Sequence, residues 1–335
     1  MTTGNNSSGN NASRNNASAN PILRSRYWGV GLRGLAMGAA DVVPGVSGGT
    51  IAFITGIYQE LLDSLSKIGP HTVVSLFRDG IAATWREING SFLLALFSGV
   101  LISIFSLAKL ISFLLENHPI LVWSFFFGLI LASVVPIARR VMHWQWSSWL
   151  ALLSGVALAI LVSEMRPTEI AATPYTLFFS GALAICAMIL PGISGSFILL
   201  MIGIYPQVIN AVHDLQIGAL IWFAAGAGCG LLLFSRVLSW LMHRFPSVTL
   251  SFLVGVLLGS LKIVWPWKLA NGDVGELSSA KLAPMLSNVS PMEFASVTGQ
   301  PSYFVGAAAA TLGAVILVLA LEWIHGRHVG KVVHE

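Results

Sequence analysis

Two short segments of this chain combine hydroxyl side chains with proline and several glycines, and apolar sequence flanks both. They are Pro44-Gly45-Val46-Ser47-Gly48-Gly49-Thr50 and Pro191-Gly192-Ile193-Ser194-Gly195-Ser196. Glycine lets a ligand approach the backbone, and hydroxyls and the first N–H groups of a following helix favour an anion. We therefore predict an anion site, with phosphate as the natural ligand. The predicted site residues in the two segments are Ser47, Gly48, Gly49, Thr50, Ser194, Gly195 and Ser196.

Each segment also breaks an apolar helix, because proline removes a backbone donor and glycine costs backbone entropy. Gly56-Ile57-Tyr58 follows the first break and recurs as Gly203-Ile204-Tyr205 after the second. Ordinary turns between helices are the alternative, but a turn gives no reason for the same ending to recur. Paired breaks in corresponding halves of a membrane protein indicate a transporter's binding site.

Charged side chains inside apolar segments are the next candidates, because each is costly if it faces lipid. Arg33, Lys109 and Arg236 are the cations that we predict to contact the phosphate. Lys109 and Arg236 occupy corresponding positions in the two halves, so they could bind the anion in turn on either side of the membrane. The alternative for each is that its long side chain extends to the lipid headgroups.

Asp41 is the acidic residue next to the first break, and Met188 takes the corresponding place in the second half. One hypothesis is a structural ion pair with Arg33, which precedes it on roughly the same helix face. The other is a proton or cation site that couples to transport. Both remain open from the sequence.

Composition places the chain in a membrane. Of 335 residues, 55% are hydrophobic and 10% are charged, whereas soluble domains carry roughly a quarter charged residues. The net charge of +4 therefore does not indicate a nucleic-acid partner. Cys186 and Cys229 lie in apolar stretches and are expected to be buried thiols. We predict no catalytic residues, no metal site and no cofactor.

The expected fold is an all-α integral membrane protein with an inverted-topology repeat. Each half holds a Pro/Gly-broken hairpin, which we expect to be re-entrant although full spanning stays open, and three transmembrane helices. The expected segments are a disordered tail (1–20); a first repeat (21–164) with hairpin 27–66, interfacial segment 67–89 and spans 91–115, 119–138 and 146–163; a second repeat (165–326) with hairpin 175–212, spans 217–242, 246–266 and 302–325 and outer loop 268–301; and a cytoplasmic tail (327–335).

Orientation follows from counting crossings. Each half crosses the membrane an odd number of times, so the second half must start on the opposite side. With both termini inside, most loop cations lie on the inner face, as the positive-inside rule requires. The inner cations are Arg14, Arg24, Arg26, Lys67, Arg78, Arg86, Arg139, Arg140, Arg244, Arg327 and Lys331, and the outer ones are Arg166, Lys268 and Lys281.

With these residues in view, the chain resembles the bacterial polyprenyl-phosphate transporters of the PopT family, formerly a domain of unknown function. The resemblance rests on Asp41-Val42-Val43-Pro44-Gly45-Val46-Ser47-Gly48-Gly49-Thr50 and on Pro191-Gly192-Ile193-Ser194-Gly195-Ser196, and it runs from about Arg33 to His325. It implies a protein of the bacterial cytoplasmic membrane that returns undecaprenyl phosphate from the outer to the inner leaflet after export of cell-wall polymers. Alternating access around a central phosphate site would move the headgroup while the tail stays in the bilayer.

Two other functions compete with lipid transport. The same breaks and cations would serve a transporter or exchanger of a small soluble anion. An intramembrane lipid phosphatase would need a nucleophile with a base, or a metal, and no histidine lies close in sequence to Ser47 or Ser194. The coupling ion, the preferred tail length and the oligomeric state are left open.

Overall fold

The chain is almost entirely helical in the computed structural model, which describes residues 21–43, 46–165, 170–270 and 286–332. The predicted tail (1–20), Pro44 and Gly45 of the first break, and the basic residues Arg166 and Lys281 lie outside the described residues. The predicted all-α class is confirmed, apart from one short two-stranded antiparallel ladder.

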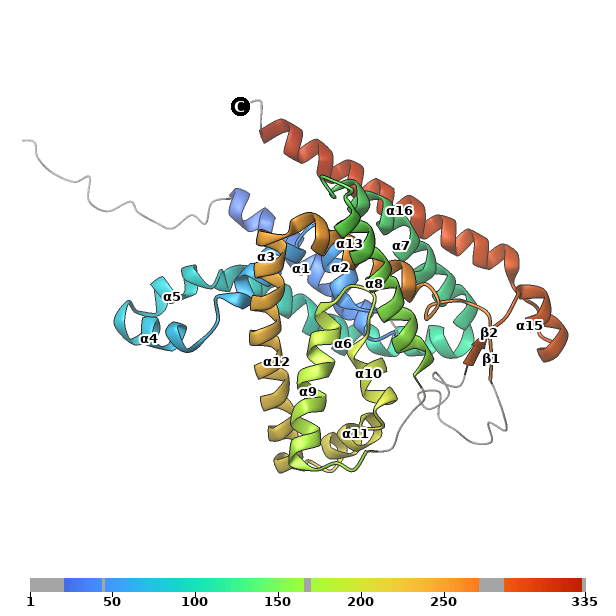
Figure 1. Cartoon of the computed structure of the whole chain (residues 1–335), viewed down its shortest axis with the longest axis horizontal. Coiled ribbons are helices and arrows are strands. Elements are labelled where there is room, and N and C mark those ends of the chain that lie inside the picture. Colours follow the sequence, from blue (N-terminus) through green and yellow to red (C-terminus); the bar gives the residue numbers. More distant parts are fainter. Residues whose placement is uncertain (1–20, 44–45, 166–169, 271–285, 333–335) are drawn as a thin grey trace, which may run out of the picture.

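The described residues of the first half form eight helices. Between the broken hairpin and the long helices, the predicted interfacial segment consists of two short helices, which project to one side of the molecule (Figure 1). The elements are α1 (Pro21–Asp41), α2 (Gly48–Ile54), α3 (Tyr58–Ser66), α4 (Pro70–Arg78), α5 (Ile81–Glu87), α6 (Gly90–Asn117), α7 (Pro119–Arg139) and α8 (Trp146–Glu164).

The second half follows the same order, with a strand pair and a short helix before its last long helix. These extra elements lie within the predicted outer loop. The elements are α9 (Pro174–Ile189), α10 (Gly195–Met201), α11 (Tyr205–His213), α12 (Ile217–Arg244), α13 (Pro246–Ser260), β1 (Lys268–Ala270), β2 (Leu286–Asn288), α15 (Pro291–Thr298) and α16 (Phe304–Val332).

The recurring Gly-Ile-Tyr sequence forms the same turn in both halves. Gly56 and Gly203 have φ angles of 76° and 73°, in the left-handed region that glycine adopts without strain. The N–H of the next residue then bonds back to the helix, with Ile57 N to Ala52 O and Ile204 N to Leu199 O both 3.0 Å. This pattern ends a helix. The repeat in sequence therefore has a local structural cause.

Long helices from the two halves pack in corresponding pairs. Within each half, α1 packs along α6, and α9 along α12; across the halves, α8 packs on α13, and α7 on α16 (Figure 1). Glycines allow the close approach of the backbones: a Cβ on Gly155 would lie 2.2 Å from Phe252 O, and a Cβ on Gly255 would lie 2.0 Å from Leu152 O. Small residues at such interfaces are typical of membrane helices.

Several helices are suited to a bilayer. α6, α7, α8 and α12 are each long and apolar enough to cross a membrane. Together, α10 and α11 would make a fifth span, but they are bent by 108° at the turn between them. The helices α9 and α13 and the Phe304–Ala320 part of α16 are apolar but shorter. The described residues thus form a multi-pass membrane protein, as composition predicts.

Candidate functional site

The two breaks lie directly against each other in the interior. The hydroxyl of Ser47 donates to the carbonyl oxygen of Met188 at 2.7 Å, and the N–H of Gly192 donates to Oγ1 of Thr50 at 2.8 Å. Both hydroxyl residues are fully buried. The first break thus binds backbone groups that the second break leaves without a helical partner. In apolar surroundings such groups must be satisfied by protein.

Gly49 lies at the closest point between the breaks. A Cβ at this position would lie 2.8 Å from the carbonyl oxygens of both Met188 and Ile189. The same carbonyl of Ile189 accepts a hydrogen bond from the Tyr58 hydroxyl at 3.0 Å, and Tyr58 is buried. Glycine is therefore required here by close backbone approach.

Replacing Gly49 by alanine should lower the thermal stability of the purified protein, because the methyl group would overlap two backbone carbonyls. Overpacking of this kind costs about 1–3 kcal/mol. Gly228 of α12 is the matched control, since a Cβ there would meet no atom within 4 Å. Thermal unfolding in detergent should show a lower melting temperature for Gly49→Ala than for Gly228→Ala. Equal melting temperatures would contradict the close contact between the breaks.

The serines of the second break bond to each other. Ser194 Oγ and Ser196 Oγ are 2.8 Å apart. Ser194 precedes α10, but its side chain accepts no hydrogen bond from the helix, whereas Ser47 Oγ accepts one from Gly49 N at 3.1 Å. Two breaks with similar sequences therefore use their hydroxyls differently.

Asp41 has a partner that the sequence did not suggest. Its Oδ1 accepts a hydrogen bond from the N–H of Gly48 at 2.6 Å. No ion pair with Arg33 occurs among the described residues. The carboxylate instead lies at the N-terminus of α2, where negative charge is favourable. An anion that reached this terminus would meet a carboxylate already in place.

Arg33 lies in a separate small cavity of about 110 Å³, together with Arg140. The cavity also contains the side chains of Thr55, Ser133 and Glu322, where α1, the end of α2, α7 and α16 meet. Neither guanidinium has a hydrogen bond or ion pair within the described part of the chain. Guanidinium groups bind phosphate through paired N–H donors. Arg140 was not among the predicted ligands, because in the sequence it stands with the cations of a predicted inner loop.

An apolar groove of about 490 Å³ adjoins the Arg33 cavity. The two share Ile54, Thr55 and Val318 as lining residues. Side chains from α1, α2, α6, α7 and α16, with His118 between α6 and α7, form the rest of the groove, and almost all of them are apolar. A cavity with two cations thus continues into a groove suited to a hydrocarbon.

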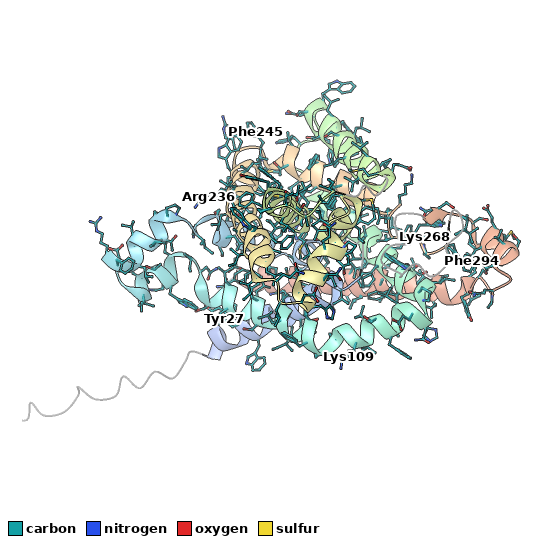
Figure 2. The ribbon with its side chains drawn as sticks, turned by 90° about the horizontal axis from the view of Figure 1, so that it is seen from below. Tyr27, Lys109, Arg236, Phe245, Lys268 and Phe294 are labelled. Atoms are coloured by element: carbon teal, nitrogen blue, oxygen red, sulfur yellow. The ribbon has the colours of Figure 1, made fainter. Side chains whose placement is uncertain are left out.

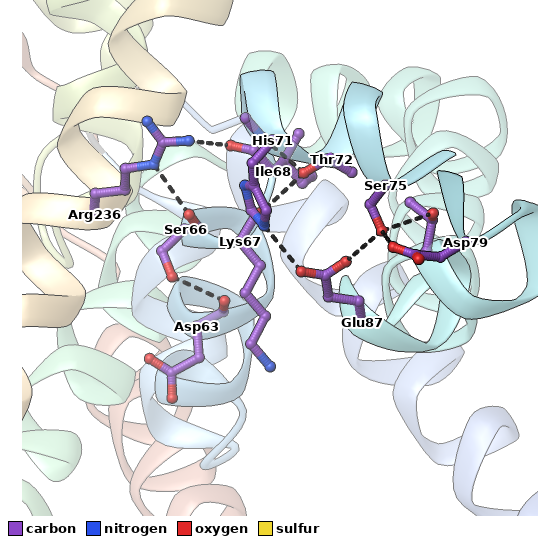
Figure 3. Close-up of polar contacts among 12 residues, drawn as sticks. Asp63, Ser66, Lys67, Ile68, His71, Thr72, Ser75, Asp79, Glu87 and Arg236 are labelled. Atoms are coloured by element: carbon purple, nitrogen blue, oxygen red, sulfur yellow. Dashed lines mark hydrogen bonds and ion pairs between the residues drawn. The ribbon is translucent and has the colours of Figure 1, made fainter. Parts of the chain in front are cut away.

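Arg236 binds the end of α3. Its Nε donates to Ser66 O at 3.1 Å, and its Nη2 donates to Ile68 O at 2.7 Å (Figure 3). Nearby, Ser239 of α12 donates to Asp63 Oδ1 at 2.6 Å. A cation is favourable at a helix C-terminus, where carbonyls lack helical partners. In this structure Arg236 therefore joins α12 to α3.

Lys109 lies on the exposed face of α6, away from the other predicted ligands. Figure 2 shows it at the lower edge of the molecule, well apart from Arg236. The structure thus brings together the hydroxyls of the first break and the backbone of the second, but it places Arg33, Lys109 and Arg236 apart from one another. Their shared role in binding phosphate stays a prediction.

Comparison with known proteins gives consistent matches. Residues 37–281 match the model of a family described as VCA0040-like, undecaprenyl phosphate translocase-like. A polyprenyl-phosphate transporter of Vibrio cholerae serotype O1 is 51% identical over 293 residues, which cover 87% of this chain and 94% of the relative. A polyprenyl-phosphate transporter of Staphylococcus aureus is 32% identical over 254 residues, covering 70% and 85% respectively. No solved structure matches the chain.

Proposed function

The chain belongs to the undecaprenyl phosphate translocase-like family, and from this premise we propose that it carries polyprenyl phosphate from the outer to the inner leaflet of the bacterial cytoplasmic membrane. The resemblance drawn from the two break motifs is confirmed by these matches. The returned lipid would serve again as the carrier for cell-envelope polymers.

The observation that carries the proposal is the cavity of Arg33 and Arg140 with its adjoining groove. A polyprenyl phosphate has a dianionic head and a long hydrocarbon tail. The cavity with two guanidinium groups matches the head, and the apolar groove matches the tail. Moving the bare headgroup through hydrocarbon would be very costly, and guanidinium groups would replace the lost water. A small soluble anion has no need of the groove, so the lipid is the better substrate.

The breaks supply the second part of the proposed path. In this structure the hydroxyls of Ser47 and Thr50 bond to the other break. We infer that these contacts separate during transport. Once the Asp41 carboxylate has also left the N–H of Gly48, the freed groups would contact the phosphate near the middle of the protein, together with Gly48, Gly49, Ser194, Gly195 and Ser196. A role for Asp41 in coupling stays a hypothesis.

An asymmetry between the halves supports alternating access. α3 packs along α12, where Arg236 binds its last carbonyls, whereas the corresponding pair, α11 and α6, shares at most a marginal contact among the described residues. Inverted repeats change state by exchanging the conformations of their halves. We infer that in the other state α11 packs on α6, and that Lys109 binds the end of α11.

Topology gives further support. Arg140, which the predicted orientation assigns to the inner side, and Glu322, which lies near the inner end of the predicted span 302–325, line one cavity. His118 and Lys268, assigned to the outer side, line another. This grouping of residues supports the proposed orientation, in which each half crosses the membrane an odd number of times.

The direct test measures undecaprenyl phosphate on the outer surface of cells depleted of this protein, with a probe that binds the exposed phosphate. We expect the lipid to accumulate and to be cleared when wild-type protein is restored. An unchanged surface level in cells that lack another recycling protein would contradict the proposal. Uptake of labelled phosphate into vesicles would then identify a small-anion transporter.

A further inference from the structure

A larger and partly polar cavity lies at the opposite end of the apolar groove. Its volume is about 620 Å³, and it is formed by the junction of α6 with α7, the segment after α13, and the region from α15 to the start of α16. Its polar lining includes Lys268, Gln300 and Tyr303. None of these residues belongs to the two breaks or to the Arg33 cavity.

Lys268 is the cation of this cavity, and its neighbours hold it in place. Its ammonium group lies 4.8 Å from the centre of the Trp123 ring and donates to the carbonyl oxygen of Ile263. Figure 2 shows it on the same side of the molecule as Phe294, another lining residue. A cation over an aromatic ring is stabilised by the ring's quadrupole. The ammonium group is therefore kept at the cavity although it has lost much of its water.

The backbone around Lys268 is also ordered. Lys268 pairs with Asn288 in the β1–β2 ladder. The indole N–H of Trp265 donates to Val289 O, and that of Trp267 donates to Ser302 O, both at 2.9 Å. Part of the predicted outer loop is therefore held by hydrogen bonds and forms one wall of the cavity.

This cavity is continuous with the apolar groove, because His118 and Leu121 line both. The far end of the groove shares Ile54, Thr55 and Val318 with the Arg33 cavity. One tail path therefore has a cation-bearing cavity at each end. A ligand with a phosphate head and an isoprenoid tail fits either end without moving its tail through packed protein.

We propose that the Lys268 cavity is the outer docking site for the phosphate headgroup of the polyprenyl lipid, from which the head passes to the Arg33 cavity. The proposal rests on the proposed transport function and adds to it the residue that captures the substrate. The Lys268 ammonium pairs with the phosphate, and Gln300 and Tyr303 offer further donors.

The charge of the site varies with pH in a defined direction. Loss of hydration lowers the pKa of Lys268 to about 8. The other titratable groups of the lining are Glu116 and His118 from the α6–α7 junction and Tyr303 before α16. Phosphate affinity should therefore fall as the pH rises through about 8.

The experiment measures binding of farnesyl phosphate to the purified full-length protein, with farnesol and inorganic phosphate as separate ligands. We expect Lys268→Gln to weaken binding of farnesyl phosphate about tenfold at neutral pH, as loss of a charged hydrogen bond implies. Lys262→Gln is the matched control, because Lys262 is exposed and paired with Glu164. Lys268→Arg should keep its affinity one pH unit above the pKa of Lys268, where the wild type loses up to about tenfold.

The outcomes separate the two proposals. If the wild type binds farnesyl phosphate and Lys268→Gln binds it with the same affinity, the proposed docking site would be overturned. The proposed transport of the lipid would not be affected. If the wild type binds inorganic phosphate as tightly as it binds farnesyl phosphate, the proposal that the substrate is a lipid would be overturned. Binding of neither phosphate by the wild type would overturn both.

Discussion

Replacing Arg33 by glutamate should abolish clearance of surface polyprenyl phosphate while the protein remains in the membrane. The substitution places a carboxylate beside Arg140, where the headgroup is proposed to bind, and it removes one of the two guanidinium groups of the cavity. A hydrogen bond between charged groups contributes about 1.5–3 kcal/mol, so even simple loss of the cation should slow transport about ten- to a hundredfold. Charge reversal should have the larger effect.

Arg139→Glu is the matched control for this variant. Arg139 is the neighbour of Arg140 at the end of α7, and both are exposed, but Arg139 does not line the cavity. We expect near-normal clearance in Arg139→Glu at equal amounts of protein in the membrane. Normal clearance in Arg33→Glu as well would show that the cavity is not part of the transport path.

Joining α3 to α12 covalently should stop transport, and cutting the link should restore it. The side chains of Asp63 and Ser239 are in contact, with Oδ1 and Oγ 2.6 Å apart. Cysteines at both positions, with Cys186 and Cys229 replaced by alanine, can be joined by a short reagent that forms a disulfide with each thiol, so that reduction cuts the link. Alternating access requires α3 to leave α12, so lipid movement in vesicles should fall to background and return after reduction.

The single-cysteine proteins, treated with the same reagent, control for modification alone. The corresponding positions in the other half are Asn210 of α11 and Ser112 of α6, and they supply a reciprocal test. Cysteines at these two positions should become joined during turnover, but not after the first link has formed. Full transport by the linked protein would mean that α3 and α12 move as one unit, and alternating access by this exchange would be wrong.

Local features of the chain were predictable from sequence because they depend on neighbouring residues. A chain with this apolar composition belongs in a membrane. Segments that combine proline and glycine break a helix whatever the rest of the fold is. Gly56-Ile57-Tyr58 and Gly203-Ile204-Tyr205 form equivalent turns, since each depends on one left-handed glycine and a hydrogen bond to a helix just before it. The family motif spans the same segments, so recognition of the family did not need the fold.

The roles of the charged residues were decided by the tertiary structure. From the sequence alone, Arg33 and Arg236 look alike, because each is a single cation within an apolar segment. Folding places Arg33 in a cavity with Arg140, and it places Arg236 against the carbonyls of Ser66 and Ile68. A cation in the membrane acts through whatever group it meets at short range, and that group is often far away in sequence.

The contacts of Asp41 and Lys268 also differ from those that the sequence indicated, because the fold brings other groups close to them. The partner of Asp41 is the N–H of Gly48 across the break, and not Arg33. Lys268 was assigned only to an outer loop, but the fold brings Trp123 of α7 under its ammonium group. Sequence determined that this is a membrane transporter with two broken helices. Which cations face an open cavity was decided only when distant helices packed, because burial and partners depend on the whole fold.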